Sequence, residues 1–462
     1  MLAKQRKRYL GTSGITVISF FSLIMFLTIL LWLPVTTNHE NPIDFIDLVF
    51  VATSAVCVTG LSTIDISKDL TLYGQVLVLL GMQIGGLGIM TFSTVIYSFI
   101  GRRIPVVSKV ALEETFLANR TKQARILFIY VLKFTFGCEA LGTLLLTGYW
   151  VLVGKFENVS TALWFALFHS VSAFTNGSFS LFSNSLGDFT DDPFVLATIG
   201  SLILLGGLGF FVCYEIQEYV RSKAMSSRAR VKLSLQSKIT LAMTAGITLF
   251  GSVLIFMLEY HGAFETHTFF SKLVNSVFYT IVPRTSGFET VPMTQFSGST
   301  LLIIMILMLI GAGAGSTGGG IKVGTAGVIL AYFVTRFRGL NYLTLWHRTI
   351  PQKTIDKSMA LLAAFFLMII GFTVALMFSE TSALSGAESQ KTFLPTIFEV
   401  ISALSTVGLS LGITPFLSEL GKVTLIVTMF VGRDSPLVLA IVLSNREHTQ
   451  KFRYSDENIM VG

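Results

Sequence analysis

Long apolar stretches recur along the whole chain and alternate with short polar phrases. The first stretch, residues 15–35, contains no charged residue, and it is long enough to cross the roughly 30 Å hydrocarbon core of a bilayer as a helix. No small-residue cleavage motif follows it, so we expect it to be retained rather than removed as a signal peptide. The pattern predicts an all-α integral membrane protein with several spans.

The apolar stretches fall into units that share one internal order. Each unit begins with a long apolar helix, continues with an amphipathic segment too short to span the membrane and a polar phrase, and closes with a second long helix. The expected opening helices are 15–35, 124–153, 237–260 and 356–380. The expected short segments are 43–56, 159–174, 269–282 and 392–405. The expected closing helices are 71–100, 191–220, 298–334 and 418–443.

The four polar phrases resemble one another. They read "CVTGLST", "FTNGSFS", "PRTSGFETV" and "STVGLSL", and they align on a residue that precedes Leu or Phe. The aligned positions recur at roughly 115 residues and are Gly60, Ser178, Gly287 and Gly408. We therefore expect four pseudo-repeats, at 1–101, 102–222, 223–336 and 337–443, followed by a cytoplasmic tail at 444–462; the second helix of the third repeat is interrupted.

The distribution of charge predicts sidedness. Hydrophobic residues make up 52% of the chain, charged residues 13%, and the net charge is +7. Lys and Arg gather near the N-terminus and in the segments 101–125, 221–238 and 335–357. The positive-inside rule places these segments and both termini in the cytoplasm. A charge divided among membrane-flanking loops fits contact with membrane lipid, and it does not form the continuous basic face that nucleic acid requires.

This topology predicts eight spanning helices and four short segments that enter and leave the membrane from the outer face. A non-helical loop at membrane depth must line a water-filled space or be buried in protein, because lipid cannot satisfy its backbone groups. Four such loops can meet on one axis and direct carbonyl oxygens at a cation. The pattern therefore favours four helix–pore-loop–helix repeats around a central cation pore.

The motifs "PRTSGF" and "SALSTVGL" resemble those of the Trk/Ktr/HKT superfamily of potassium transporters, and the whole chain is most similar to the membrane subunit of bacterial Ktr systems. The resemblance implies potassium uptake through a selectivity filter. It implies K⁺, with Na⁺ as an alternative, as the transported or activating ion, and K⁺ in the filter as the only bound metal. The implied filter residues are Val58, Thr59, Gly60, Thr175, Asn176, Gly177, Ser178, Thr285, Ser286, Gly287, Thr406, Val407 and Gly408.

The second phrase departs from the family pattern. Gly177 comes one place early, and Ser178 stands where the other phrases have glycine. Either the loop shifts its register so that Gly177 serves, or Ser178 occupies the ring at a cost in backbone strain. In the related plant transporters a serine at a filter-glycine position accompanies sodium permeation, so a poorly selective Na⁺/K⁺ pathway is an alternative function.

The third repeat's second helix is interrupted by "GAGAGSTGGGIK". No strand precedes these glycines, so they do not predict a dinucleotide site; so many glycines do disfavour a helix. The resemblance implies an intramembrane gating loop made of Gly311, Ala312, Gly313, Ala314, Gly315, Ser316, Thr317, Gly318, Gly319 and Gly320. Close helix packing through small residues is the alternative, and it is our expectation for the shorter "GGLG" clusters at 85–88 and 206–209.

Three further charges are functional candidates. Arg433 lies inside the last apolar stretch, where a charge is expensive. The resemblance implies that it faces the pore and holds the gating loop, although Asp434 and Ser435 depart from the family pattern and Asp434 could neutralise it. We expect Arg284 and Glu399 to support the filter from behind as buried charges, with exposure in the outer vestibule as the alternative.

The sequence also bears on other functional classes and on partners. An ion-coupled secondary transporter is an alternative, since such proteins place broken helices at the midplane. The spans carry no paired acids, His cluster or nucleophile–base set, so we expect no enzyme. We expect no covalent cofactor. The resemblance implies a homodimer in the plasma membrane, regulated by a separate cytosolic RCK ring that would supply the only nucleotide site.

Overall fold

The computed structural model describes residues 12–38, 43–88, 121–224, 232–381 and 386–433. Helices dominate these ranges, and the same order of elements occurs in each quarter of the chain. The first quarter contains α1 (Thr12–Leu31), α2 (Phe45–Cys57), α3 (Ile66–Asp69) and α4 (Leu72–Leu87). The second contains α7 (Thr121–Val153), α8 (Val159–Thr175), the 3-10 turn Gly187–Phe189, α9 (Pro193–Leu208) and α10 (Phe210–Ala224).

The second half of the chain follows the same order. The third quarter contains α11 (Leu235–Glu259), α12 (Phe269–Ile281), the 3-10 turns Val282–Arg284 and Met293–Gln295, α13 (Gly298–Leu309) and α14 (Val323–Phe337). The fourth contains α15 (Gln352–Thr381), α16 (Gly386–Leu404), the 3-10 turn Thr414–Phe416 and α17 (Glu419–Arg433). The opening helices and short segments agree with the sequence prediction to within a few residues.

Glycines end or interrupt the first two closing helices earlier than predicted. The helix predicted at 71–100 ends at Leu87, where Gly88 has a φ of 80°. The helix predicted at 191–220 breaks at Gly209, with a φ of 97°, and α10 is bent by 100° from α9. Positive φ is costly for residues other than glycine, so these glycines end the helices. The predicted ranges 89–100 and 434–443 lie outside the described residues.

The lengths of the described helices support fewer spans than the eight predicted. Ile129–Val153 within α7, α11 and α15 are long and apolar enough to cross a membrane, and α9 with α10 would make a fourth span. Helices α4, α13 and α14 are apolar but shorter. The described apolar part of α1, Val17–Leu31, is also among the shorter helices. The other differences arise where glycines end or divide a closing helix, or where the prediction extends beyond the described residues.

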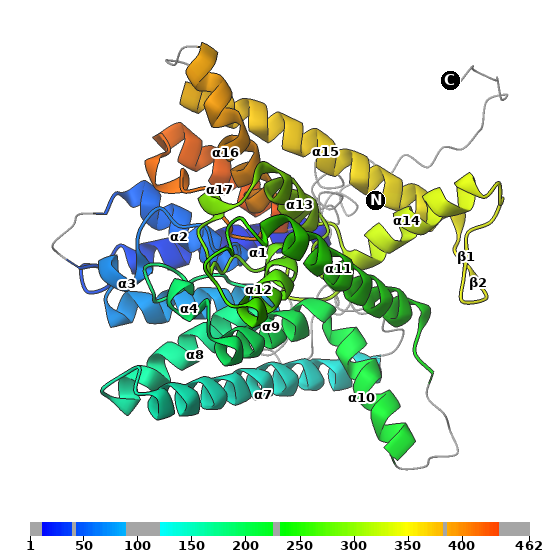
Figure 1. The fold of residues 1–462 in the computed structure, drawn as a ribbon, viewed down its shortest axis with the longest axis horizontal. Helices are drawn as coiled ribbons and strands as arrows, with labels where there is room; N and C mark the ends of the chain where they lie inside the picture. The colour runs from blue at the N-terminus through cyan, green and yellow to red at the C-terminus, as the bar shows by residue number, and fades with distance from the viewer. Residues whose placement is uncertain (1–11, 39–42, 89–120, 225–231, 382–385, 434–462) are drawn as a thin grey trace, which may run out of the picture.

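A small β-hairpin departs from the predicted all-α class. Strand β1 (Thr344–Leu345) pairs antiparallel with β2 (Arg348–Thr349) between α14 and α15. The two turn residues, Trp346 and His347, have φ values of 46° and 61°, which is the backbone that a two-residue hairpin turn requires. The hairpin lies beside the end of α14 at the edge of the helical assembly (Figure 1).

Each short helix packs against the long helix that precedes it, as in the pairs α7 with α8 and α15 with α16. In Figure 1, α7 and α15 run along opposite edges of the assembly, with the short helices between them. One buried apolar cluster lies mainly in the second and third quarters, and another joins the first quarter to parts of the second and fourth. The short helices therefore lie toward the middle of the assembly, together with α1 and α11 (Figure 1).

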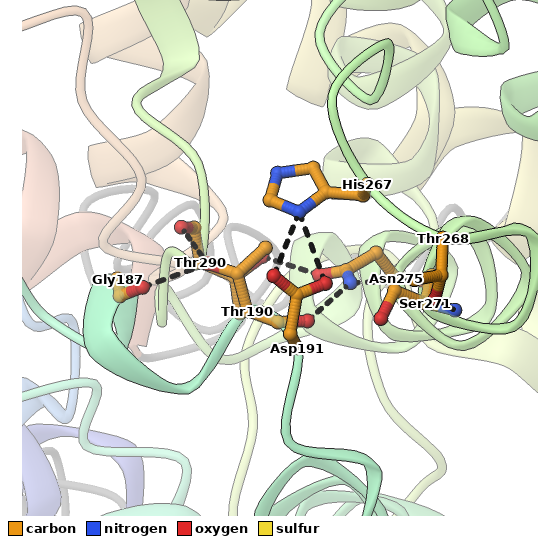
Figure 2. Close-up of polar contacts among 8 residues, drawn as sticks. All are labelled: Gly187, Thr190, Asp191, His267, Thr268, Ser271, Asn275 and Thr290. Atoms are coloured by element: carbon orange, nitrogen blue, oxygen red, sulfur yellow. Dashed lines mark hydrogen bonds and ion pairs between the residues drawn. The ribbon is translucent and has the colours of Figure 1, made fainter.

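A polar network joins the loop before α9 to the short helix α12 (Figure 2). The carboxylate of Asp191 accepts hydrogen bonds from His267 Nδ1 at 3.0 and 3.1 Å. Asn275 Nδ2 donates to the carbonyl of Thr190 at 2.8 Å, and Thr290 Oγ1 donates to Asn275 Oδ1 at 2.6 Å. These contacts fix the beginning and the middle of α12, and with them the third polar phrase that follows it.

Candidate functional site

Three of the four polar phrases adopt the same backbone conformation. The short helices α2, α8 and α16 are followed by a left-handed residue, namely Val58, Asn176 and Thr406, with φ values of 56°, 60° and 50°. Two residues later, Gly60, Ser178 and Gly408 have φ values of 91°, 64° and 96°. Ser178 therefore occupies the position of the glycines, and the alternative register, in which Gly177 would serve, is wrong.

Backbone hydrogen bonds to the end of the short helix produce this shared conformation. In each of these three phrases, the residue between the two left-handed positions donates its N–H to the carbonyl of a serine five residues earlier. The three bonds are Thr59 N to Ser54 O at 2.8 Å, Gly177 N to Ser172 O at 2.7 Å and Val407 N to Ser402 O at 2.9 Å. The chain therefore doubles back at the end of each of these short helices.

The second phrase differs in how its serine side chain is used. In the first and fourth phrases the glycine N–H binds a serine hydroxyl, Gly60 to Ser54 at 2.9 Å and Gly408 to Ser402 at 3.1 Å. In the second phrase Ser172 Oγ instead donates to the carbonyl of Phe179 at 2.8 Å. The second phrase is thus a variant of the common conformation.

The third phrase takes another course. Its helix α12 tightens into the 3-10 turn Val282–Arg284, after which Thr285 has a φ of −172° and a ψ of 4°. Ser286 N donates to the carbonyl of Val282 at 2.8 Å. The third loop therefore reaches the other three without a left-handed residue.

The four aligned positions meet at one place. A Cβ atom on Gly60 would overlap the side chain of Ser178, and one on Gly287 would overlap the backbone of Gly408. The hydroxyl of Ser178 accepts a hydrogen bond from Gly287 N at 2.6 Å and donates one to the carbonyl of Val407 at 2.8 Å. The second loop thereby connects the third and fourth loops directly.

Buried side-chain oxygens without a hydrogen-bond partner gather in the same loops. Within the part of the chain that the structure describes, every phrase contributes at least one. They are Thr59 Oγ1, Asn176 Oδ1, Ser286 Oγ, Ser405 Oγ and Thr406 Oγ1. An unpaired buried polar atom is costly. A set of unpaired oxygens from four converging loops matches what a dehydrated alkali cation requires as ligands.

A cavity of about 500 Å³ opens over one side of the convergence point. Its lining includes all four aligned positions, serine and threonine side chains, and the carboxyl groups of Asp65, Asp69 and Glu289. Burial raises the pKa of Asp65, but hydrogen bonds from Ser67 and Ser183 outweigh it, so the pKa of this carboxyl lies below its ordinary value. The carboxylate of Asp65 therefore places a negative charge on the cavity wall, which attracts cations.

The glycine-rich segment between α13 and α14 folds back on itself. Its two ends are paired, because Gly311 N donates to Ile321 O at 3.0 Å and Ile321 N donates to Leu309 O at 3.1 Å. Ala312 N donates to Gly319 O at 3.3 Å, further along the loop. The interruption is therefore an ordered loop between two half-length helices, as the glycine content predicted.

This loop docks into the break between α9 and α10. Gly313 N donates to the carbonyl of Gly207 at 2.8 Å, and Phe210 N donates to the carbonyl of Gly315 at 3.0 Å. The "GGLG" cluster at 206–209 was predicted to serve helix packing alone. That prediction is incomplete, because the broken helix supplies the backbone groups that bind the loop.

Close packing also occurs at these clusters. A Cβ atom on Gly85, Gly206 or Gly432 would overlap the carbonyl oxygen of Val56, Phe174 or Leu404, respectively. Each of these carbonyls lies near the C-terminal end of a short helix. The closing helices therefore approach the short helices at glycines, at the level of the polar phrases.

The loop lies against the side of the phrases that faces away from the cavity. A Cβ atom on Gly318 would overlap Thr285, and one on Gly319 would overlap the hydroxyl of Thr406. Asn176 Nδ2 donates to Thr317 Oγ1 at 2.6 Å. Gly311 to Gly313 and Thr317 to Gly319 are buried, whereas Ala314 is exposed. The loop thus closes the space beneath the convergence point.

Two cationic side chains bind carbonyl groups of this loop. Arg433 Nη1 donates to the carbonyl of Thr317 at 2.5 Å, and its Nη2 donates to the carbonyl of Gly85. Lys322 Nζ donates to the next loop carbonyl, that of Gly318, at 2.6 Å. Sequence reasoning missed Lys322, although a lysine inside an apolar stretch, two residues after a glycine run, is itself a signal of function. Asp434 and Ser435 lie outside the described residues.

Arg284 and Glu399 are both buried, at 4% and 0% exposure. Glu399 accepts hydrogen bonds from Ser410 Oγ and Leu411 N at the end of the fourth phrase, and from Thr414 Oγ1 just beyond it. Arg284 Nη2 donates to Thr244 Oγ1 at 3.3 Å, and its Nε and Nη1 have no hydrogen-bond partner among the described residues. The alternative expectation, that Arg284 and Glu399 are exposed in an outer vestibule, does not agree with this burial.

Comparison with known proteins decides the family. A family model described as TrkH, cation transport protein, matches residues 3–452. The chain belongs to the TrkH family of cation transport proteins. As a member of this family it is a membrane transporter, and its apolar helices agree with that assignment.

Several TrkH-family relatives match over nearly their whole length. Ktr system potassium uptake protein B of Vibrio alginolyticus is 35% identical over 99% of this chain and 97% of the relative. Potassium/sodium uptake protein NtpJ of Enterococcus hirae is 32% identical over the full length of both. The crystal structure of the potassium transporter TrkH from Vibrio parahaemolyticus has the same fold, with a TM-score of 0.68 and 20% identity over 92% of this chain and 84% of that one.

Proposed function

We propose that the chain takes up potassium ions across the plasma membrane through a pore at the centre of four pseudo-repeats. The observation that carries this proposal is the convergence of Gly60, Ser178, Gly287 and Gly408 between an acidic cavity and a closed loop. Cations would collect in the cavity, pass the ring of loops and meet the loop 311–320 beyond it. The relatives named potassium uptake proteins support the choice of ion.

The chemistry of the loops supports a cation rather than a larger solute. The unpaired oxygens of Thr59, Asn176, Ser286 and Thr406 are neutral hydroxyl and amide ligands. Such ligands, together with backbone carbonyls, can replace the hydration shell of K⁺ and still release it. The described residues contain no cluster of His, Cys, Asp and Glu that could hold a tightly bound metal ion.

The loop 311–320 would serve as the gate of this pathway. Its contacts with Thr285, Thr406 and Asn176 close the space below the ring in the conformation seen here. Arg433 would hold the loop closed and repel cations that pass the ring. Glu399 and Arg284 would support the fourth and third loops from behind.

Partners and sidedness belong to the same proposal. The basic connecting segments would face the cytoplasm together with both termini. The name "Ktr system", which several relatives carry, supports a second, regulatory component. We propose that this component is a cytosolic nucleotide-binding RCK ring and that the membrane subunit is a homodimer within membrane lipid.

Rubidium uptake into proteoliposomes tests the function. The purified chain should take up ⁸⁶Rb⁺ in response to a negative internal potential, and external K⁺ should compete. Gly287→Asp should abolish uptake, since any side chain at this position overlaps the fourth loop. Gly298→Asp is a matched control at the start of α13, where a Cβ atom meets no neighbour among the described residues. Absence of uptake by the native chain, or equal uptake by Gly287→Asp, would contradict the proposal.

A less selective Na⁺/K⁺ pathway is the second candidate. The Ser178 side chain stands in a ring of glycines and places a hydroxyl among the carbonyls. A relative named potassium/sodium uptake protein supports this candidate. Comparable uptake of ²²Na⁺ and ⁸⁶Rb⁺ by the native chain would favour it over potassium uptake.

A further inference from the structure

One side-chain hydrogen bond joins the second polar phrase to the loop 311–320. Asn176 Nδ2 donates to Thr317 Oγ1 at 2.6 Å, across 141 positions of sequence. Asn176 is 0% exposed and Thr317 is 1% exposed. A buried, short hydrogen bond between two neutral side chains is lost at a cost, because no water replaces the partner.

Thr317 is the loop residue at which three other elements meet. Its N–H donates to Gly206 O at the end of α9, at 3.3 Å. Its hydroxyl donates to Phe174 O near the end of α8, also at 3.3 Å, and its carbonyl accepts from Arg433 of α17. Movement of the loop away from the phrases would therefore break the contact with Asn176 together with the contact with Arg433.

Asn176 differs from the residues at the same place in the other loops. Val58 and Thr406 share its left-handed backbone, but neither makes a side-chain hydrogen bond to the loop 311–320 within the described residues. Asparagine tolerates this backbone better than valine or threonine. Its Oδ1 has no hydrogen-bond partner in the same part of the chain, so Thr317 is what fixes the orientation of the carboxamide.

We propose that the Asn176–Thr317 hydrogen bond couples the gate to the filter, with Asn176 and Thr317 as positioning residues. While the loop is closed, Thr317 holds the carboxamide and, through it, the left-handed turn that presents Ser178 to the other three loops. When the loop leaves, that turn loses its support. This inference rests on the proposed cation pathway and adds a link between its two parts.

The coupling has a thermodynamic consequence. If the position of the loop alters the affinity of the filter for a cation, cation binding alters the position of the loop by the same factor. Removing the bond should therefore change how strongly K⁺ binds and how well it is distinguished from Na⁺, and not only how often the loop opens. A purely structural contact would not change the discrimination between the two ions.

The test is ⁸⁶Rb⁺ uptake into proteoliposomes as a function of external K⁺ and Na⁺. Thr317→Val removes the hydroxyl, and Thr317→Ser keeps it. Thr135→Val is the matched control, because it makes the same substitution at a buried threonine of α7 whose hydroxyl has no hydrogen-bond partner among the described residues. Asn176→Ala and the double variant with Thr317→Val complete a cycle.

We expect Thr317→Val to raise the K⁺ concentration for half-maximal uptake about fivefold or more and to lower the ratio of K⁺ to Na⁺ uptake. Thr317→Ser and Thr135→Val should match the native chain. Asn176→Ala should reproduce the change of Thr317→Val, and the double variant should add nothing to it. If Thr317→Val does not fold, the comparison of Asn176→Ala with the native chain tests the coupling by the same ratio of K⁺ to Na⁺ uptake.

Three results would overturn the coupling. In the first, Thr317→Val raises maximal uptake with an unchanged half-maximal concentration and ion ratio. In the second, Thr317→Ser behaves like Thr317→Val. In the third, the effects of the two single variants multiply in the double variant. Absence of uptake by the native chain would instead refute the proposed function itself, so the two failures are distinct.

Discussion

The hydroxyl of Ser178 accepts a hydrogen bond from the backbone N–H of Gly287 at 2.6 Å. The same hydroxyl donates to the carbonyl of Val407 at 2.8 Å. One side chain thus occupies a donor of the third loop and an acceptor of the fourth, at the point where four loops meet. A glycine at this position would release both groups and enlarge the space between the loops.

Ser178→Gly should increase the preference for K⁺ over Na⁺. The variant frees the Val407 carbonyl to bind a cation, and it relieves the strain of a serine with a φ of 64°, which costs of order 1–3 kcal/mol. The measurement is the ratio of ⁸⁶Rb⁺ to ²²Na⁺ uptake in proteoliposomes. Ser180→Gly, two residues further along the same phrase, is the control. An unchanged ratio would show that the serine is a tolerated variation.

Arg433→Ala should raise cation flux. Hydrogen bonds from a charged donor are worth about 1.5–3 kcal/mol, and a loss of 1.4 kcal/mol corresponds to about tenfold in the equilibrium between closed and open loop. Uptake of ⁸⁶Rb⁺ per folded molecule measures the effect. Arg338→Ala removes an exposed arginine at the end of α14 and should leave uptake unchanged. A variant that folds and transports at the native rate would remove Arg433 from the gate.

Gly206→Ala should destabilise the protein. A methyl group there overlaps the carbonyl oxygen of Phe174, and overpacking of this kind costs about 1–3 kcal/mol. Gly246→Ala is the matched control in α11, because a Cβ atom there meets nothing within 4 Å in the described part of the chain. Thermal unfolding in detergent should show a lowered midpoint for Gly206→Ala only. Equal midpoints for the two variants would contradict the close approach of α9 to α8.

Much of the architecture was predictable from the pattern of apolar stretches. The opening helices and short segments follow from length and periodicity, because a helix must bury or expose whole faces. The breaks at Gly88 and Gly209 were not predicted, since glycine inside an apolar stretch fits a packed helix as well as a broken one. At Gly209 the helix breaks because Phe210 N donates a hydrogen bond to Gly315 O. Gly315 is about 100 residues away in sequence, so the local pattern does not predict the break.

The candidate site was predictable where a local rule applies. The interruption at 311–320 follows from glycine content, and the cost of a charge inside an apolar stretch singled out Arg433. The register of the second phrase could not be predicted, because "NGS" satisfies either alignment until the hydrogen bonds to α8 are known. The contacts of Lys322 and Thr317 depend on how the loop folds, and composition does not determine that fold. The hairpin at Trp346 and His347 lacks the glycine or asparagine that usually marks such a turn.

Asp191→Asn should lower stability near neutral pH more than in acid. Hydrogen bonds from Ser271 and then His267 hold the pKa of Asp191 below its ordinary value of 3.8. The ionised carboxylate therefore stabilises the fold fully above that ordinary value, and this stabilisation is lost as the pH falls through the folded-state pKa. Unfolding midpoints of the native chain and the variant should differ at pH 7 and converge toward pH 3. Glu265→Gln, at an exposed glutamate, should show no such difference. A difference in midpoint between Asp191→Asn and the native chain that is constant with pH would contradict a stabilising role of the ionised Asp191 carboxylate.

Deletion of residues 311–320 tests the account most directly. Ile310 and Ile321 lie side by side in a parallel bridge, so the ends that the deletion joins are already neighbours. Uptake of K⁺ and ⁸⁶Rb⁺ by the deletion variant in proteoliposomes should exceed that of the native chain severalfold, because the space beneath the four loops is then open. A folded deletion variant with native uptake would show that ions do not pass this loop, and the proposed pathway would be wrong.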